Sequence, residues 1–392
     1  MTSFTESEER QALRAAVAKL ATAYGREYFT RQARTGGKTT DLWLEIGKHG
    51  YLGINIPEEY GGGGGGIGDT AAVCEELAAQ GCPLLMMVVS PAICGTVISR
   101  FGTEGQKRRW LPGIADGTAT MAFAITEPDA GTNSHNITTT ARRTGDGWIL
   151  NGRKVFISGV DEAENVLIVA RTEDARTGKL KPCLFVVPTE APGFEYSPIE
   201  MEIVSPEKQF AVFVDDVRLP ADALIGNENA GLVQLFAGLN PERIMAASFS
   251  TGLARYALDK AVAYVKEREV FGAPIATHQG LAHPLAQSKI EIELARLMTQ
   301  KAAALYDDAA AGDDLAEQEV GEAANMAKYA AAEAACDAAD RAVQAHGGNG
   351  ITTEYGVAGL LVAARAGRIA PVSREMILNF VGMHSLGLPR SY

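Results

Sequence analysis

The stretch TMAFAITEPDAGTNSHNITTTARRTGDGWILNGRKVFIS, residues 120–158, decides the fold, because hydrophobic residues begin here to recur at every second position. Short runs with this period continue to about residue 226 and are separated by turn formers such as Gly145-Asp146-Gly147. Alternation of this kind predicts half-buried strands joined by tight turns. We therefore expect a compact antiparallel sheet domain, built as a small barrel or sandwich.

Both flanks of this stretch have the period of helices. On the N-terminal side, Leu13, Val17 and Leu20 share one helical face. On the C-terminal side the pattern is helical to the end, with an alanine-rich stretch whose small side chains suit close packing in a bundle. This order disfavours a Rossmann unit, which needs alternating strands and helices. The predicted class is α+β, with a helical N-terminal domain, a middle β-domain and a C-terminal helical bundle, at residues 1–117, 118–226 and 227–392.

Composition narrows the functional class. The chain has 392 residues, 46% of them hydrophobic and 21% charged, as in globular proteins. A formal net charge of −12 argues against nucleic acid or an anionic membrane surface as partner. The N-terminus does not resemble a secretory signal, no apolar run is long enough for a membrane span, and the five cysteines lack metal-ligand spacing. We expect a reduced, cytoplasmic protein without a bound metal.

A run of six glycines at residues 61–66 can hold no regular element. Glycine-rich segments behave as coil, so the sequence predicts a flexible surface loop here.

Four short motifs carry polar or aromatic residues next to turns. Phe156 and Ser158 combine a flat ring with a hydroxyl donor, and Arg268 offers a fork of donors suited to phosphate. Each motif alone is also compatible with an ordinary turn or helix end. The motifs are ITEPDAGTNS (125–134), KVFISG (154–159), EREVFGAPIATHQ (267–279) and QAHGGNGITTEY (344–355).

The order of these motifs resembles that of the acyl-CoA dehydrogenase family over essentially the whole chain. PEEYGG at 57–62 and DDVRLPADALIG at 215–226 are similar to that family as well. The resemblance implies a four-helix bundle at the C-terminus, assembly as a homotetramer or homodimer, and FAD between the β-domain and the bundle. It also implies an electron-transfer flavoprotein as the electron acceptor.

The resemblance assigns two groups of FAD-binding residues and a substrate side. Thr132 and Arg243 would lie on the side of the acyl thioester. The residues facing the flavin would be Phe123, Ile125, Thr126, Thr132, Phe156 and Ser158. The residues holding the adenine dinucleotide part, partly across a subunit boundary, would be Arg268, Phe271, Gln279, Gln344 and Gly348.

The catalytic base needs a separate argument. In this family a carboxylate removes the α-proton of the thioester while the β-hydrogen passes to flavin N5. Many members carry that glutamate near the C-terminus, where this chain has Pro371 and Val372. A subset resembling the isovaleryl and long-chain dehydrogenases places it before an arginine, which matches Glu242-Arg243 and makes Glu242 our expected base.

Other interpretations remain open at this stage. Asn240 and Pro241 could simply begin a helix, where an acidic first turn is favourable without any catalysis, and Glu375 is a rival carboxylate. In the family, the backbone N–H at the position of Pro371 donates to the thioester oxygen, and proline has no N–H. Either Val372 or another group donates instead, or the oxyanion hole is weaker, which predicts slow turnover or a substrate with a more acidic α-position. An acyl thioester oxidase, an enoyl-thioester reductase or a non-catalytic homologue would share the fold.

Overall fold

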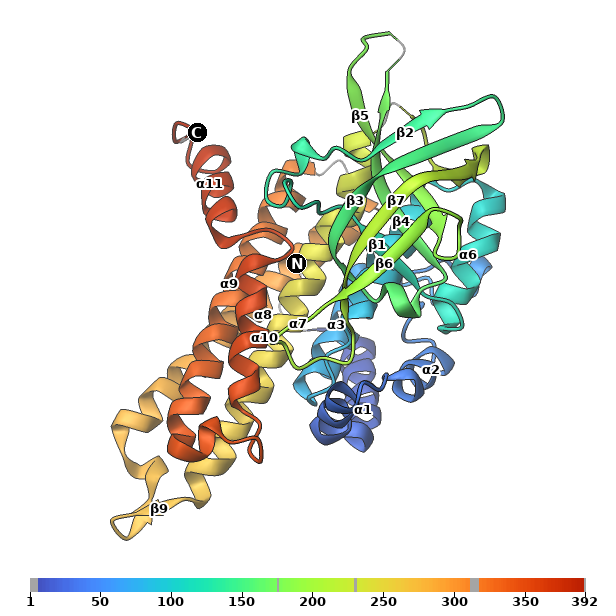
Figure 1. Cartoon of the computed structure of the whole chain (residues 1–392). Coiled ribbons are helices and arrows are strands. Elements are labelled where there is room, and N and C mark those ends of the chain that lie inside the picture. The colour runs from blue at the N-terminus through green and yellow to red at the C-terminus, as the bar shows by residue number, and fades with distance from the viewer. Residues whose placement is uncertain (1–5, 175, 229–230, 311–316, 391–392) are drawn as a thin grey trace.

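The computed structural model describes residues 6–174, 176–228, 231–310 and 317–390. Figure 1 shows the three regions in chain order, with blue N-terminal helices, a green sheet on the upper right, and long yellow to red helices running along the other side. The predicted succession of helical, sheet and helical regions is confirmed.

The N-terminal region is helical and contains one irregular turn. A π-helical segment, η2 (Val88–Gly95), includes Pro91 and is buried throughout. Wide turns of this kind occur mainly at functional sites. The surrounding helices are α1 (Glu8–Thr35), α2 (Thr40–Lys48), α3 (Ile67–Ala79), α4 (Leu85–Met87), α5 (Thr96–Phe101) and α6 (Glu104–Asp116), with a short 3₁₀ turn at η1 (Glu58–Tyr60).

The glycine run between η1 and α3 has no helix or strand, as predicted, but its backbone is not left to water. The N–H of Gly63 donates to the carbonyl of Gly53 at 2.9 Å, and that of Gly65 to Ile54 at 2.7 Å. A Cβ on Gly62 would lie 2.0 Å from the Ile56 carbonyl oxygen. Glycine is required here for close backbone approach, which the prediction of a flexible surface loop did not include.

The middle region is one eight-stranded sheet in the order β6-β7-β3-β2-β4-β5-β8, with β1 paired to β4. The predicted antiparallel pairing holds for most neighbours, but β1 and β2 run parallel to β4. β1 enters directly after α6, so no hairpin fixes its direction. The strands are β1 (Met121–Ala124), β2 (Thr140–Arg143), β3 (Gly147–Ser158), β4 (Asn165–Glu173), β5 (Leu180–Pro188), β6 (Phe194–Ile199), β7 (Gln209–Pro220) and β8 (Leu224–Ile225).

The C-terminal region is a bundle whose helices pack through alanine. Alanines on α9 are almost completely buried, which lets α9 approach α7 and α8 closely. A small hairpin at the far end joins α7 to α8 (Figure 1). The elements are α7 (Gly231–Glu267), β9 (Glu269–Val270), β10 (Ala273–Pro274), α8 (Gln279–Ala310), α9 (Glu317–His346), α10 (Ala358–Ile369) and α11 (Arg374–His384).

Pro241 lies inside α7, so the helix start predicted at Asn240 is wrong. Proline has no N–H to donate to the carbonyl of Ala237, four residues earlier. The hydroxyl of Tyr306 on α8 donates to that carbonyl at 3.0 Å and satisfies it. Since Glu242 is not in a first helical turn, the helix dipole does not explain an acidic residue there.

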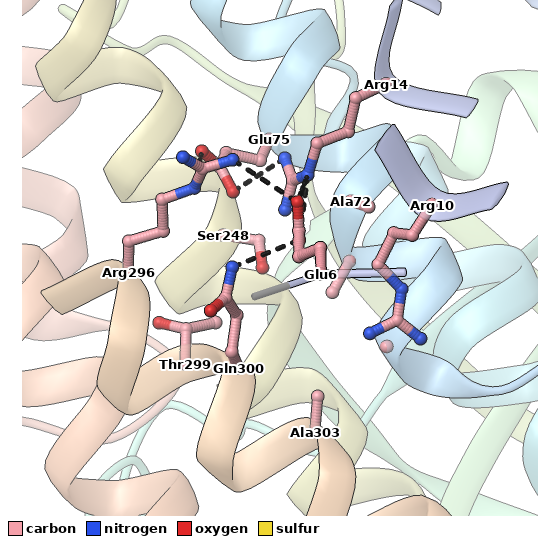
Figure 2. A pocket seen from close by; sticks show the side chains of 12 residues that line it. Glu6, Arg10, Arg14, Ala72, Glu75, Ser248, Arg296, Thr299, Gln300 and Ala303 are labelled. Carbon is pink, nitrogen blue, oxygen red and sulfur yellow. Dashed lines mark hydrogen bonds and ion pairs between the residues drawn. The ribbon is translucent and has the colours of Figure 1, made fainter. Parts of the chain in front are cut away.

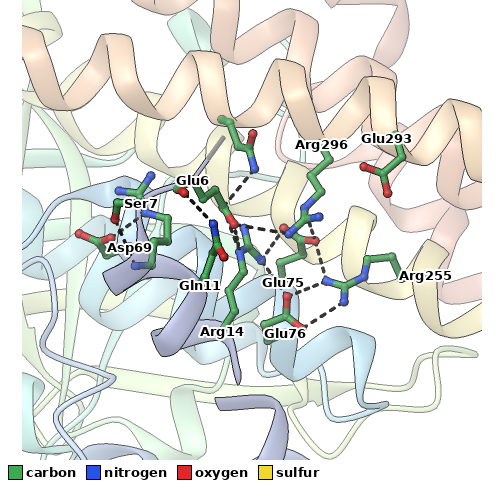
Figure 3. Close-up of polar contacts among 12 residues, drawn as sticks. Glu6, Ser7, Gln11, Arg14, Asp69, Glu75, Glu76, Arg255, Glu293 and Arg296 are labelled. Atoms are coloured by element: carbon green, nitrogen blue, oxygen red, sulfur yellow. Dashed lines mark hydrogen bonds and ion pairs between the residues drawn. The ribbon is translucent and has the colours of Figure 1, made fainter. Parts of the chain in front are cut away.

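A buried ion-pair network fixes the N-terminal helices against the bundle (Figure 3). Glu75 on α3 forms ion pairs with Arg14 of α1 at 2.9 Å, Arg255 of α7 at 2.7 Å and Arg296 of α8 at 3.1 Å. Figure 2 shows the adjoining cavity, of about 10 Å³, which has room for about one water. The network therefore serves docking of the two helical regions. No described helix has the length and apolar composition that a membrane span requires.

Candidate active site

Glu242 lies on α7 among groups from three elements. The charges of Arg243 and of Lys328 on α9 act on it, and its own charge acts on the Cys94 thiol of η2. Its side chain is half-buried. Burial raises the pKa of Glu242 to about 7, although the two cations act in the opposite direction. A carboxylate with this pKa can take and return a proton near neutral pH.

Arg243 has an unsatisfied donor in this environment. Its Nη1 donates to the carbonyl of Leu239 at 2.9 Å and to Asn240 Oδ1 at 3.4 Å. Its Nε is buried without a hydrogen-bond partner among the described residues. Burial lowers the pKa of Arg243, and Glu242 opposes that shift. The guanidinium therefore keeps a donor for a further ligand.

Lys328 is a site residue that the sequence analysis missed. It is 1% exposed, and its Nζ donates to the backbone carbonyl of Val372 between α10 and α11. The signal was present in the sequence, because Lys328 is a cation in the alanine-rich part of the helix, thirteen positions before Arg341. A lysine in a helix that is buried on most sides is almost never fully buried unless its ammonium group has a partner.

Glu375, the rival carboxylate, is in a different environment. It lies in the first turn of α11, its side chain is 71% exposed, and it forms a 3.5 Å ion pair with Arg374. Pro371, in the preceding loop, is also exposed. The structure thus distinguishes the two candidates by burial, since Glu242 is half-buried and Glu375 is exposed.

The first two motifs are brought together at one end of the sheet. The N–H of Val155 donates to the carbonyl of Thr126 at 3.0 Å, and Lys154 Nζ donates to that of Ile125 at 3.0 Å. The Cys94 thiol donates to the carbonyl of Ala122 at 3.6 Å, which connects β1 to the segment beside Glu242. The flavin-side motifs and the proposed base therefore belong to one continuous region.

A buried ion pair anchors the loop that carries Thr132. Lys154 Nζ lies 2.9 Å from Glu127 Oε1, and both side chains are almost inaccessible to solvent. The backbone and hydroxyl groups of Thr138 and Thr139 donate to the same carboxylate at 2.6 to 2.9 Å. Burial opposes ionisation of Glu127, but these hydrogen bonds and Lys154 outweigh it and lower its pKa to about 2.

Phe156 is held in an exposed and strained position. The pairing of β3 with β7 is irregular between Lys154 and Ile157, and Phe156 within this bulge has a φ of 58°. Its ring is 55% exposed. Such backbone conformations cost about 1–3 kcal/mol and gather at functional sites. Two residues on, the Oγ of Ser158 accepts from the Gln209 amide at 2.9 Å.

The other predicted flavin-side residues differ in exposure. Thr132 is exposed, and Ile125 and Thr126 are half-buried. Phe123 lies within the hydrophobic core at 8% exposure. An exposed ring with hydroxyls nearby fits a flat heteroaromatic group that has polar edges, as the isoalloxazine of FAD does.

The fourth motif packs against Tyr264, three residues before the third motif, at the opposite end of the bundle. The ring of Tyr264 stacks on His346 with centroids 4.2 Å apart, and its hydroxyl accepts from Asn349 at 3.0 Å. Phe271, at the tip of the β9–β10 hairpin, is 96% exposed with a φ of 57°. The remaining members of the predicted group are all exposed, namely Arg268, Gln279, Gln344 and Gly348.

The two groups lie far apart within one chain. Arg268 follows Glu242 by 26 positions, and nearly all of them are in α7. A helix rises 1.5 Å per residue, so about 39 Å of α7 separates the groups. Figure 1 shows β9 at the end of the bundle remote from β1.

The comparisons with known proteins agree with this architecture. Family models described as the N-terminal, middle and C-terminal domains of acyl-CoA dehydrogenase match residues 7–118, 122–213 and 229–386. Acyl-CoA dehydrogenase FadE12 of Mycobacterium tuberculosis is 66% identical over 391 residues, which cover 100% of this chain and 99% of that protein. The mouse mitochondrial long-chain specific acyl-CoA dehydrogenase is 32% identical, over 90% of this chain and 81% of that protein.

Solved structures show the same likeness. A glutaryl-coenzyme A dehydrogenase complex aligns with a TM-score of 0.92 at 30% identity, over 100% of this chain and 98% of that one. A glutaryl-CoA dehydrogenase from Mycobacterium smegmatis in complex with FADH2 aligns at 0.89 and 27%, over 99% and 96%. The chain belongs to the acyl-CoA dehydrogenase family. It is an oxidoreductase that uses FAD to dehydrogenate an acyl-CoA.

Proposed function

We propose that Glu242 is the base that removes the α-proton of the acyl thioester. The observation that carries this proposal is its half-buried carboxylate, with a pKa raised to about 7, on a helix adjoining the flavin-side motifs. A carbon acid of this kind is deprotonated only where solvent is excluded and the enolate-like charge is stabilised. FAD, when bound, supplies the acceptor for the β-hydride.

The chain's own residues would act around this proton transfer. Glu242 receives the proton on a carboxylate oxygen, and Arg243 and Lys328 provide positive charge beside it. The buried Nε of Arg243 is an available donor on the substrate side. We place Thr132 on the substrate side, and Phe156, Ser158, Thr126, Ile125 and Phe123 around the flavin. Because Pro371 has no N–H, a weaker oxyanion hole and slow turnover remain our prediction.

The test is anaerobic mixing of the purified holoenzyme with a panel of saturated acyl thioesters while flavin absorbance is recorded. We expect the wild type to be bleached and Glu242→Gln to be bleached about 10³-fold more slowly, since general bases contribute roughly 10²- to 10⁴-fold. Flavin content of the two proteins should be equal.

Glu375→Gln is the matched control, because its carboxylate is solvent-exposed. It should be bleached at the wild-type rate. Equal bleaching of wild type and Glu242→Gln, or slow bleaching of Glu375→Gln alone, would show that the base is misassigned. Fast reoxidation of the reduced enzyme by oxygen would favour an oxidase.

We further propose that a second copy of the chain completes each FAD site, in a homodimer or homotetramer. The exposed Arg268 and Phe271 support this proposal. They follow the far end of α7, and the length of that helix separates them from the flavin-side group of their own protomer. Ile290, Leu294 and Leu297 form an exposed apolar stripe on α8 and offer a contact surface. Sedimentation of the holoenzyme measures the oligomeric state.

Electron-transfer flavoprotein is our proposed electron acceptor, on the basis of family membership. Five free cysteines, four of them buried, support work in the reducing cytoplasm. We propose domain limits at residues 117/118 and 226/227, which fall just before β1 and just before α7. Reduction of the flavoprotein by substrate-reduced enzyme tests the acceptor.

A further inference from the structure

Lys328 is a buried cation whose hydrogen bond is to the main chain. Its residue exposure is 1%, and Nζ donates to the carbonyl of Val372. Burying an ammonium group is costly unless its charge is balanced nearby. The balance has to come from the carboxylates that face it, which are Glu242 on α7, Glu333 on α9 and Glu375 on α11, whereas Arg243 on α7 faces it with a like charge.

Two of the three facing carboxylates are engaged elsewhere. Glu333 forms ion pairs with Arg368 at 2.8 Å and Arg374 at 3.3 Å. Glu375 pairs with Arg374 and is 71% exposed, so water screens it. Glu242 is the third: its charge acts on Lys328 less strongly than those of Glu333 and Glu375, and Lys328 and Arg243 act on Glu242 in turn.

On the η2 side, Glu242 faces a neutral group, the thiol of Cys94. Burial raises the pKa of Cys94 well above its ordinary value, and Glu242 acts in the same direction, so the η2 side presents a neutral thiol. Burial lowers the pKa of Lys328 to about 8, and Arg243 contributes, so the ammonium form persists at neutral pH. Among the described residues, Arg243 and Lys328 are thus the cations whose charges act on Glu242.

We propose that Lys328 is a positioning residue for the base: its ammonium group ties the 370–373 loop to α9 through Val372 and supplies charge that keeps Glu242 ionised. This inference rests on the proposed role of Glu242 as the base and adds that Lys328 is needed to keep that base ionised. The charge of Lys328 and its hydrogen bond to Val372, which we call the tether, can be tested separately. A glutamine at this position keeps a hydrogen-bond donor without the charge, and a methionine has neither.

The experiment uses holoenzyme variants Lys328→Met, Lys328→Gln and Lys328→Arg. The infrared carboxyl band that is absent in Glu242→Gln reports protonation of Glu242 without any turnover. We expect its midpoint to rise by about one pH unit in Lys328→Met and Lys328→Gln, because loss of a nearby cation disfavours the carboxylate. Lys328→Arg should restore the wild-type midpoint.

Amide hydrogen exchange over residues 370–376 tests the tether. Exchange should accelerate in Lys328→Met and stay slow in Lys328→Gln and Lys328→Arg. Lys301→Met, which removes an exposed lysine from α8, is the matched control and should change neither readout. If Lys328→Met does not fold, the glutamine variant alone decides the charge effect.

An unchanged Glu242 midpoint in both uncharged variants would overturn the charge role, and unchanged exchange in Lys328→Met would overturn the tether. Failure of every thioester to bleach the wild-type flavin would instead count against the proposed function. The infrared titration would still report on Lys328 in that case, so the two failures are distinguishable.

Discussion

The flavin-side end of the sheet and the far end of the bundle carry similar residues in opposite surroundings. Phe156 and Phe271 both have φ near +60°, a strained conformation for a non-glycine residue. Phe156 is supported by a twelve-residue strand and a buried ion pair, whereas Phe271 is 96% exposed on a short hairpin. The contrast supports our proposal that one half of the FAD site is formed within the chain and that the other half is completed by a second copy.

Breaking the buried ion pair between Lys154 and Glu127, which supports the flavin-side end of the sheet, should have the largest effect on stability. Lys154→Met leaves the Glu127 carboxylate buried without its cation, which costs about 3–5 kcal/mol of unfolding free energy. Chemical denaturation of the flavin-free protein measures this. Lys289→Met, which breaks an exposed pair with Glu293 on α8, should cost under about 1 kcal/mol, and equal losses would contradict the comparison.

A substitution at the far end of the bundle, where Arg268 and Phe271 lie, should weaken flavin binding and leave the fold intact. Arg268 is exposed and we place it on the phosphates of FAD, so Arg268→Gln loses charge-assisted hydrogen bonds worth about 1.5–3 kcal/mol. Equilibrium dialysis should show FAD bound tenfold or more weakly, with an unchanged melting temperature of the flavin-free protein. Arg109→Gln, an exposed site on α6, is the control. Unaltered FAD affinity would remove Arg268 from the site.

The pH dependence of flavin reduction should report Glu242. Burial raises its pKa to about 7, so below that pH the rate should fall about tenfold per unit as the base is protonated. The pH dependence of stability has the opposite sign. Because the pKa of Glu242 is higher in the folded than in the unfolded state, its ionisation destabilises the fold as the pH rises from the unfolded-state pKa through about 7. Glu242→Gln should therefore raise the melting temperature more at pH 8 than at pH 4.5. A pH-independent rate from 5 to 8 would contradict this assignment.

The smallest predicted effect concerns the segment of α7 that connects the two halves. Tyr306→Phe removes the donor that satisfies the Ala237 carbonyl opposite Pro241, at a cost of about 1 kcal/mol. Thermal unfolding measures it, and Tyr196→Phe at an exposed site on β6 is the control. No difference between the two variants would show that water can replace the hydroxyl.

The sequence predicted where the motifs lie, but not the tertiary contacts around them. The period change near residue 120 predicted the sheet region, and the ordered motifs predicted the family. The pair Asn240-Pro241 has good helix-start chemistry, yet α7 runs through it, because a tyrosine 65 positions later on α8 satisfies the freed carbonyl. Local preference was overridden there by a tertiary contact.

By itself the sequence determined which segments alternate as strands or repeat as helices. It also predicted which residues meet FAD, and it showed Pro371 and Val372 at the position of the common C-terminal glutamate, which made Glu242 the expected base. Only the tertiary structure decided that Glu242 is half-buried while Glu375 faces water, and that the charge of Lys328 acts on Glu242. The physical reason is that burial and charge balance depend on distances between residues far apart in the chain. The charges of residues 242 and 328 act on each other only because α7 and α9 pack together.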